Sequence, residues 1–293
     1  MKLEARMLFY DQVHMDVYRT HDKHIVETVV FAGTNYHKTL ISVTNQIGCP
    51  VRCDFCFGHN FPYARNITAD EFMQQVSGAL EENPLVPWYD PERPVKVGFQ
   101  RAGEALLNKN FYDGLEKIAE AYKPSFQLTS VMPNSEVSLK LIEKMRQYLS
   151  EYKETFQINV SMHTTDEDKR KEMMSGFNHL MDYKEIAEFG EQWVREVRKR
   201  RIDLSFVLME DNEVDFVKVR ELFDPRYFSM RFAFYLPSSE ETARLHQPST
   251  LERMNRKSLE ARELGYHCVQ SFAGPVEGRW DTRPFSALKL FKE

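Results

Sequence analysis

The chain has 293 residues, of which 42% are hydrophobic and 13% aromatic, enough apolar material for the core of one large domain. Its formal net charge of −5 gives no general reason to expect a nucleic-acid partner, although a local basic face stays compatible with it. The N-terminus is mixed and charged, without the apolar core of a signal peptide, and no apolar run has the length of a membrane span. We therefore expect a cytoplasmic protein that has no membrane partner.

Short apolar runs alternate with longer segments of helical periodicity, which is the pattern of repeated βα units around a parallel sheet. The expected strands are Thr39–Thr44, Val95–Gln100, Ser125–Ser130, Phe156–Ser161, Ile202–Leu208 and Ser229–Tyr235, with His24–Phe31 before them and Tyr266–Phe272 after them. The expected helices are Thr68–Glu82, Asn108–Tyr122, Ser135–Ser150, Tyr183–Arg201, Asn212–Phe223 and Ser249–Leu264. Thr68 before Glu71, and Ser249 before Glu252, have the spacing of helix N-caps.

The six predicted units are fewer than the eight of a closed barrel. We therefore predict an α/β fold with a partial (βα)6 barrel over residues 39–272. A small N-terminal β element over residues 1–38 precedes it, and a C-terminal extension over residues 273–293 follows. Functional side chains should gather where the strands end, because the βα loops of such sheets meet at that edge.

Three of the four cysteines lie within eight residues, as Cys49, Cys53 and Cys56, on the loop after the first barrel strand. This spacing places three thiolates close enough to hold three corners of a cubane iron–sulfur cluster, and it leaves one iron for a ligand from outside the protein. It is the spacing of radical S-adenosylmethionine (SAM) enzymes, in which the open iron binds SAM. A structural zinc site completed by His59 is the alternative.

Gly103 and Glu104 follow the second barrel strand. A glycine lets the backbone approach a ligand closely, and a carboxylate beside it can accept hydrogen bonds from an ammonium group such as that of SAM. The alternative is an ordinary strand-to-helix turn with Asn108 as the N-cap. Phe55, inside the cysteine loop, either shields the cluster from solvent or stacks on an adenine ring.

Polar residues also end the third and fourth strands, as Thr129 and Ser130 and then Ser161, Met162 and His163. Serine and threonine at strand ends often form turns. Each of these residues therefore either stabilises a turn or contacts a ligand. An imidazole at a barrel mouth is placed for acid–base catalysis or for a ribose contact, which makes His163 a candidate catalytic residue.

The segments TLISVTNQIGCPVRCDFCFGH, GEALLN, VSMHTTDEDKRKEMM and FVLMEDNEVDFVKVRELF together resemble the RlmN/Cfr family of radical SAM enzymes, which methylate adenosine in ribosomal RNA. The similarity runs from about His21 to Gly278. It implies a radical SAM barrel and a [4Fe-4S] cluster on the three cysteines. The SAM contacts that it implies are Gly103, Glu104, a hydroxyl at Thr129 or Ser130, and Ser161 to His163.

The resemblance also implies two further cysteines that take part in methyl transfer. Several positions of this chain depart from what the resemblance implies. Ser42 stands at the first cysteine position, and residues 273–293 contain no cysteine. Arg231 stands where the family has an asparagine that contacts SAM. We also expect the protein to lack the family's extended N-terminal RNA-binding region. Because a serine oxygen cannot replace a thiolate in disulfide chemistry, we expect a retained radical generator with a different outcome.

The fourth cysteine, Cys268, is expected on the last strand. It is either a small buried residue or, if it faces the barrel mouth, a hydrogen-atom donor to a carbon radical. The second reading makes Cys268 a candidate catalytic residue of a redox-neutral reaction.

Together these features predict a radical SAM enzyme. Reductive cleavage of SAM at a [4Fe-4S] cluster would give a 5′-deoxyadenosyl radical, which would abstract hydrogen from a small natural-product or sugar-like substrate. Epimerisation, with Cys268 as hydrogen donor, dehydrogenation and dehydration all fit, and a redox-neutral change is favoured. The expected partners are this substrate and an electron donor such as flavodoxin or ferredoxin. The alternatives are an RNA-modifying enzyme with altered chemistry and a non-catalytic iron–sulfur or SAM-binding sensor.

Overall fold

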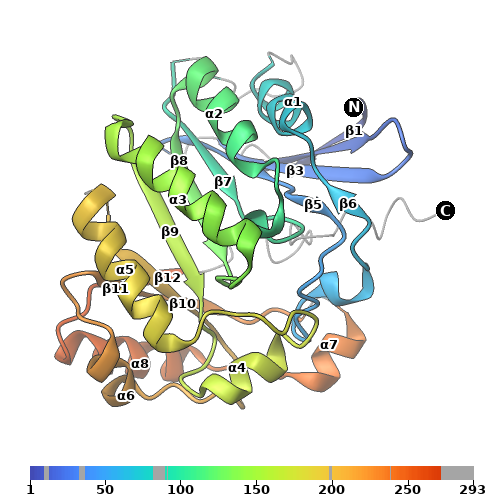
Figure 1. Cartoon of the computed structure of the whole chain (residues 1–293). Helices are drawn as coiled ribbons and strands as arrows, with labels where there is room; N and C mark the ends of the chain where they lie inside the picture. The colour runs from blue at the N-terminus through green and yellow to red at the C-terminus, as the bar shows by residue number, and fades with distance from the viewer. Residues whose placement is uncertain are drawn as a thin grey trace.

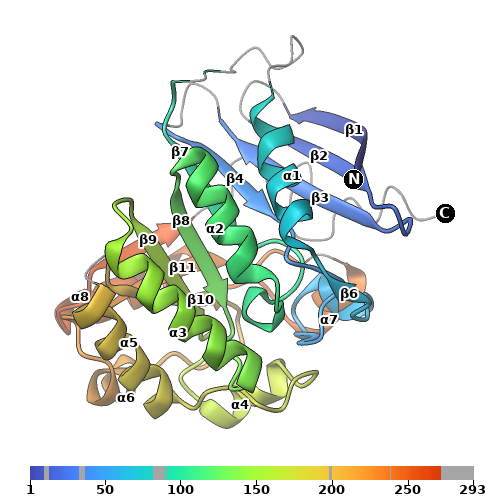
Figure 2. The same ribbon diagram turned by 45° about the horizontal axis from the view of Figure 1, so that its top comes forward.

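One curved sheet organises the molecule. The computed structural model describes residues 1–9, 13–32, 37–81, 90, 92–197, 200–237 and 239–271. Ten strands form this sheet, in the order β1-β2-β3-β4-β7-β8-β9-β10-β11-β12. Most of the helices lie along its convex side (Figure 1, Figure 2).

The larger part of the sheet is parallel, from β4 to β12. Its strands are β4 (Thr39–Val43), β7 (Val95–Phe99), β8 (Ser125–Ser130), β9 (Phe156–Ser161), β10 (Ile202–Leu208), β11 (Phe228–Phe234) and β12 (Cys268–Ser271). These agree with the strands expected from the sequence to within one or two residues. The end predicted for the last strand, at Phe272, lies outside the described residues. The predicted α/β fold with a partial parallel barrel is confirmed.

The helices follow the strands in turn. They are α1 (Ala69–Leu80), α2 (Phe111–Tyr122), α3 (Glu136–Glu151), α4 (Glu167–Met173), α5 (Tyr183–Val197), α6 (Phe216–Leu222), α7 (Glu240–Leu245) and α8 (Leu251–Glu263). The prediction missed α4 and α7, which are short and lie near the end of the sheet where β9 and β11 stop (Figure 1).

Some predicted helix starts are wrong. Helix α2 starts at Phe111 and not at Asn108, because the short 3-10 helix η2 (Ala105–Leu107) comes first and has Asn108 as its C-cap. Helix α6 starts after Asp215 instead of at Asn212. The N-cap of α8 is Thr250 and not Ser249, since the Thr250 hydroxyl accepts the amide hydrogen of Arg253. The predicted capping box at Thr68 is present.

Three antiparallel strands extend the sheet beyond β4, namely β1 (Lys2–Phe9), β2 (Val13–Arg19) and β3 (Ile25–Phe31). The sequence predicted only the last of them, because the exposed and charged residues of β1 hide its period. The division into units at residues 38 and 272 stays a prediction, since residues 273–293 lie outside the described part of the chain.

The two faces of the parallel sheet differ in chemistry because successive side chains of a strand point to opposite sides. In β9, Phe156, Ile158 and Val160 belong to the main core under the helices. Gln157 and Asn159 alternate with them and therefore face the interior of the barrel. Apolar residues of β9 cover only one face, so the main core lies between the parallel sheet and its helices. Among the described residues, no helix is both long and apolar enough to cross a membrane.

The N-cap of α1 provides a test of local stability. The Thr68 hydroxyl accepts the amide hydrogen of Glu71 at 3.2 Å. We expect Thr68→Ala to lower the free energy of unfolding by about 1 kcal/mol, the usual contribution of such a cap, when measured by urea denaturation. Ser77→Ala, an exposed change in the same helix, should alter it by less than about 0.5 kcal/mol. Equal stabilities for the two variants would contradict the assignment.

Candidate active site

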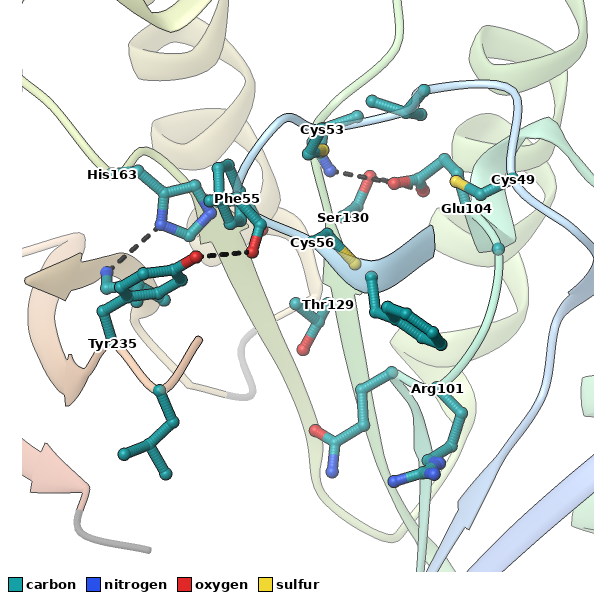
Figure 3. A pocket seen from close by; sticks show the side chains of 18 of the residues that line it. Cys49, Cys53, Phe55, Cys56, Arg101, Glu104, Thr129, Ser130, His163 and Tyr235 are labelled. Atoms are coloured by element: carbon teal, nitrogen blue, oxygen red, sulfur yellow. Dashed lines mark hydrogen bonds between the residues drawn. The ribbon is translucent and has the colours of Figure 1, made fainter. Parts of the chain in front are cut away.

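A cavity of about 380 Å³ opens where the parallel strands end (Figure 3). The cysteine loop forms one wall. It lies between the short paired strands β5 (Gln46–Ile47) and β6 (Arg65–Asn66), which come after β4, and it contains the 3-10 helix η1 (Phe57–Asn60). Ten of the predicted site residues line the cavity, namely Cys49, Cys53, Phe55, Cys56, Gly103, Glu104, Thr129, Ser130, Ser161 and His163. Residues far apart in the chain thus meet as the βα topology predicts.

Phe57, an aromatic residue that flanks the cysteines as Phe55 does, also lines the cavity. The sequence did not predict the rest of the lining, which consists of Val51, Gln100, Arg101, Val131, Val207, Phe234, Tyr235 and Leu236. Most are apolar residues near strand ends, and nothing in their local pattern distinguishes them from core residues. Arg101 is the exception, because it is a charged residue directly after a strand, and its guanidinium forms an ion pair with buried Glu27.

Backbone contacts hold the cysteine loop against the segment that follows α4. The amide of Asp54 donates to the carbonyl of Met173 at 3.0 Å, and the amide of Gly176 donates to the carbonyl of Val51 at 3.0 Å. A Cβ at Gly176 would lie 2.6 Å from that same carbonyl oxygen, so only glycine permits this close approach. The loop is therefore positioned by the rest of the fold before any ligand binds.

Two side chains, those of Tyr235 and His246, also contact the cysteine loop and hold it in place. The Tyr235 hydroxyl lies 3.2 Å from the carbonyl oxygen of Phe55 and 3.1 Å from that of Thr242. The ring of His246 places Nε2 3.1 Å from a carboxylate oxygen of Asp54. Through these contacts the end of β11 and α7 are coupled to the residues between the cysteines.

The three thiols share an environment that disfavours thiolates unless a cation is present. Burial raises the pKa of Cys49 to about 12, and it raises the pKa values of Cys53 and Cys56 as well. The amide of Gly58 donates to Cys56 Sγ at 3.3 Å, a contact that favours the ionised form. Iron bound to the sulfurs would supply the missing positive charge, because a coordinating thiol is deprotonated by its metal.

The donor geometry fits a cluster better than a zinc ion. In the described part of the chain, no three Cys, His, Asp or Glu side chains converge on the position of a single ion. A zinc ion needs four ligands at about 2.0–2.3 Å, whereas each cysteine of a cubane cluster binds a different iron. The ring of His59 instead has Nδ1 3.0 Å from the carbonyl oxygen of Arg52. The three-cysteine loop therefore fits a [4Fe-4S] cluster.

Glu104 is a buried carboxylate that joins two strand ends. Its Oε1 accepts hydrogen bonds from the Ser130 hydroxyl at 2.8 Å and the Leu106 amide at 3.0 Å, and its Oε2 accepts one from the Val131 amide at 2.9 Å. Burial raises the pKa of Glu104, while these hydrogen bonds and the charge of Arg170 act in the opposite direction. A carboxylate has about four acceptor positions, so one remains for a donor in the cavity.

Gly103 has a packing role in addition to the predicted ligand contact, which stays a prediction. Its φ of +86° lies in the left-handed region, and a Cβ there would lie 2.5 Å from Cβ of Gln46. The side chain of Gln46 accepts the amide hydrogen of Glu104 at 2.9 Å. The glycine therefore lets Gln46 pack closely and orient Glu104, although Gly103 also lines the cavity.

His163 is held as a neutral imidazole. Its Nδ1 accepts the amide hydrogen of Val207 at 3.1 Å, and its ring packs edge-on against Phe55 with ring centroids 4.7 Å apart. Burial, and then the charge of Arg170, lower the pKa of His163 to about 3. The acid–base role predicted for this residue stays a prediction. With Nδ1 accepting, Nε2–H is a hydrogen-bond donor, so the predicted ribose contact stays open.

Arg170 on α4 is a positioning residue that the sequence did not predict. Its fully buried guanidinium donates to the carbonyl oxygens of Ser161 at 3.1 Å, Val131 at 2.7 Å and Met181 at 3.2 Å. It thereby ties the ends of β8 and β9 to α4. The available signal was its place in the segment VSMHTTDEDKRKEMM, which carries the family resemblance.

Two predicted SAM contacts do not line the cavity. Met162 is fully buried in the main core, because it alternates with Ser161 and His163 along the strand end. Arg231 lies inside the barrel, where its guanidinium pairs with Asp203 at 3.1 Å and donates to the Ser271 hydroxyl at 2.9 Å. Both assignments are corrected for these reasons.

Cys268 also lies outside the cavity. It is buried in the main core between sheet and helices, and its Sγ lies 3.6 Å from the carbonyl oxygen of Tyr266. In β12 it pairs with Met230, another residue of that core. This placement contradicts the predicted role of Cys268 as a hydrogen donor at the barrel mouth.

A partial parallel barrel, a three-cysteine loop after its first strand and a buried carboxylate beside the cysteines define a radical SAM protein. A solved structure entitled a radical SAM methyltransferase, from Sphaerobacter thermophilus, has the same fold, with a TM-score of 0.74, 18% identity, and coverage of 94% of this chain and 78% of that one. No family model matches the chain.

Curated relatives place the chain more narrowly. A protein of Petrotoga mobilis, named a probable dual-specificity RNA methyltransferase RlmN, is 25% identical over 232 residues, which are 78% of this chain and 62% of that protein. A protein of the same name from Chlorobium phaeobacteroides is 30% identical over 158 residues, or 53% of this chain and 41% of that one. The chain thus spans between two fifths and two thirds of these proteins. It belongs to the radical SAM superfamily and is RlmN-like, with 25% and 30% sequence identity to these two relatives.

Membership of this superfamily implies a [4Fe-4S] cluster and SAM as cofactors. The residues present fit both groups. Cys49, Cys53 and Cys56 would hold the cluster, and Glu104 and His163 offer an acceptor and a donor beside it for the polar groups of SAM.

The four cysteines provide matched variants for the cluster assignment. After anaerobic reconstitution, Cys49→Ser, Cys53→Ser and Cys56→Ser should each lose most of the bound iron and sulfide, together with their visible absorbance, because each removes one of three ligands. Cys268→Ser should keep the content of the unsubstituted protein, since its side chain lies in the core. Equal losses in all four variants would refute the assignment.

The neutral state of His163 predicts a pH dependence of stability. Below about pH 6.5 the unfolded chain binds a proton at this residue that the folded chain, with a pKa of about 3 there, does not bind. The free energy of unfolding should therefore fall with decreasing pH, by up to about 1.4 kcal/mol per unit for this one group. His163→Gln should flatten the decline in urea denaturation of cluster-free protein at pH 7, 6 and 5. If the free energy of unfolding declined equally with pH in both proteins, His163 would have the same pKa in the folded and the unfolded chain.

Proposed function

We propose that this protein is a radical SAM enzyme that takes a hydrogen atom from a small natural-product or sugar-like molecule. The observation that carries the proposal is that the three cysteines, Glu104 and His163 open onto one cavity of about 380 Å³. This volume lies in the range of small-molecule sites.

The chain's own residues would bind and orient the cofactors. When bound, the cluster and SAM supply a carbon radical able to take hydrogen from an unactivated carbon. The three cysteines would hold the cluster, and the remaining acceptor position of Glu104 suits an ammonium group. Nε2–H of His163 would donate to a hydroxyl or carboxylate oxygen, and the ring of Phe55 beside it offers an apolar surface to an adenine.

Apolar side chains would exclude water from the reacting atoms. Val51, Val131 and Val207 line the cavity together with Phe234 and Leu236. Removing water prevents the quenching of reactive intermediates. The electron for cleavage of SAM must come from another molecule, and we propose a low-potential donor such as flavodoxin or ferredoxin in the cytoplasm.

The structure changes which reactions of the substrate radical we propose. Because Cys268 is buried among core residues, epimerisation with this thiol as hydrogen donor is not proposed. Methylation through two additional thiols is not proposed either. Ser42, where the resemblance implies one of them, is a buried residue of β4.

RNA modification with altered chemistry is the second candidate function. It is favoured by the names of the matched relatives, which describe them as RNA methyltransferases. Incubation of the reconstituted protein with ribosomal RNA, followed by mass analysis of its adenosines, would decide. A new mass that depends on SAM would support RNA modification over a small-molecule substrate.

The formation of 5′-deoxyadenosine tests the radical proposal directly. Reconstituted protein with dithionite and SAM should release it under anaerobic conditions. Glu104→Gln should weaken SAM binding by about tenfold or more, because a hydrogen bond to a charged group contributes about 1.5–3 kcal/mol. Glu136→Gln, an exposed change on α3, should bind SAM normally. No 5′-deoxyadenosine from the unsubstituted protein would refute both enzyme readings and leave the sensor.

A further inference from the structure

The inner face of the barrel is polar and is exposed in part. Thr129, Ser205 and Arg231 point to this side of β8, β10 and β11 and are partly exposed. Phe206 and Phe232 follow directly in β10 and β11, point to the helices and are fully buried. A barrel interior filled by packed apolar side chains would show no such difference. Gln127, Asn159 and Asp203 of the same face are buried, so a ligand would reach this face through its partly exposed positions.

A chain of side-chain hydrogen bonds runs along this face to the cavity. Lys96 on β7 donates through Nζ to Oε1 of Gln127 on β8. Gln127 donates in turn through Nε2 to Oε1 of Gln100 at 2.7 Å. Gln100 lines the cavity that the cysteines open onto. Lys96 is thus two hydrogen bonds away from the cavity wall.

Asn159 lies beside this chain on β9. Its Nδ2 donates at 3.3 Å to the hydroxyl of Thr129, which also lines the cavity (Figure 3). Its Oδ1 is buried and has no hydrogen-bond partner among the described residues. Buried polar atoms are normally paired, so this amide is an incomplete part of the network and a position where a ligand donor would be satisfied.

The two cationic side chains of the inner face, Arg231 and Lys96, differ in their negative partners. Arg231 is paired with Asp203, whereas no carboxylate of the described residues lies within ion-pair distance of Lys96. Burial lowers the pKa of Lys96 to about 8, and the positive charges of Arg231, Arg200 and Lys38 act in the same direction, while Asp203 opposes them weakly. A half-buried ammonium without a counter-ion is unfavourable. An anion beside it would remove this cost.

We propose that this inner face binds the substrate through an anionic group, and that the substrate is a small polar molecule carrying a carboxylate or a phosphate. The lumen site consists of Lys96, Gln100, Gln127, Thr129, Asn159 and Arg231. Lys96 pairs with the anion, and the amides and the hydroxyl bind polar groups nearer the cavity. This inference rests on the proposed function, since it names the substrate class of the same site.

Binding to reconstituted protein without reductant tests the lumen site. Isothermal titration calorimetry would compare gluconate, glucose 6-phosphate and the neutral polyol sorbitol. At least one anion should bind at least tenfold more tightly than sorbitol, and which one does so distinguishes carboxylate from phosphate. Gluconate keeps its charge between pH 7 and pH 9, whereas burial lowers the pKa of Lys96 to about 8. Any gluconate affinity should therefore fall at the higher pH.

Variants of Lys96 and Lys140 test whether anion binding depends on the charge of Lys96 itself. Lys96→Met should weaken anion binding at least tenfold and Lys96→Arg should retain most of it, while Lys140→Met, an exposed change on α3, should have no effect. Anion binding no tighter than that of sorbitol, unchanged in Lys96→Met, or absent altogether would overturn the inference. The pH comparison uses the unsubstituted protein, so it stands even if Lys96→Met fails to fold. Because no 5′-deoxyadenosine is measured here, this inference and the radical proposal can fail separately.

Discussion

Each side chain of a parallel strand points either toward the covering helices or into the barrel, and the chemistry of this molecule depends on that alternation. Ser161 and His163 reach the cavity while Met162 between them is buried in the core. The same rule turns Cys268 toward the helices and leaves Arg231 inside the barrel. The alternation therefore divides the polar residues into a set that can meet substrate and cofactors and a set that only packs.

Buried charges then hold the strand ends in place around the cysteines. Arg170 donates to three carbonyl oxygens from different segments, and Glu104 accepts from two amides and a hydroxyl. A buried charge is costly unless hydrogen bonds surround it, so these groups specify one arrangement of the loops. The same environment keeps His163 neutral and raises the pKa values of the cysteine thiols. In this setting a bound cation would be needed to stabilise the cysteine thiolates, and a neutral His163 would be available as a hydrogen-bond donor.

Much of the barrel could be read from local patterns. The runs Ser125–Ser130, Phe156–Ser161 and Ile202–Leu208 coincide with β8, β9 and β10, because buried parallel strands are short apolar runs between capped helices. Strand β1 was missed because its exposed, charged residues mask its period, and α4 because its seven residues give too short a pattern. The cysteine loop and Glu104 were found because their spacing and order carry chemical meaning, whereas Tyr235 and Val207 have no such signal.

The sequence by itself determined the class of the protein, since three cysteines at fixed spacing and the order of βα units depend only on neighbours along the chain. It also determined the resemblance to RlmN-like proteins. Only the tertiary structure decided that Cys268 is a core residue, that His163 is neutral and that Lys96 faces the barrel interior without a carboxylate partner among the described residues. Direction, burial and charge pairing depend on residues far apart in the chain, which come together only when the sheet curves and the helices cover one of its faces.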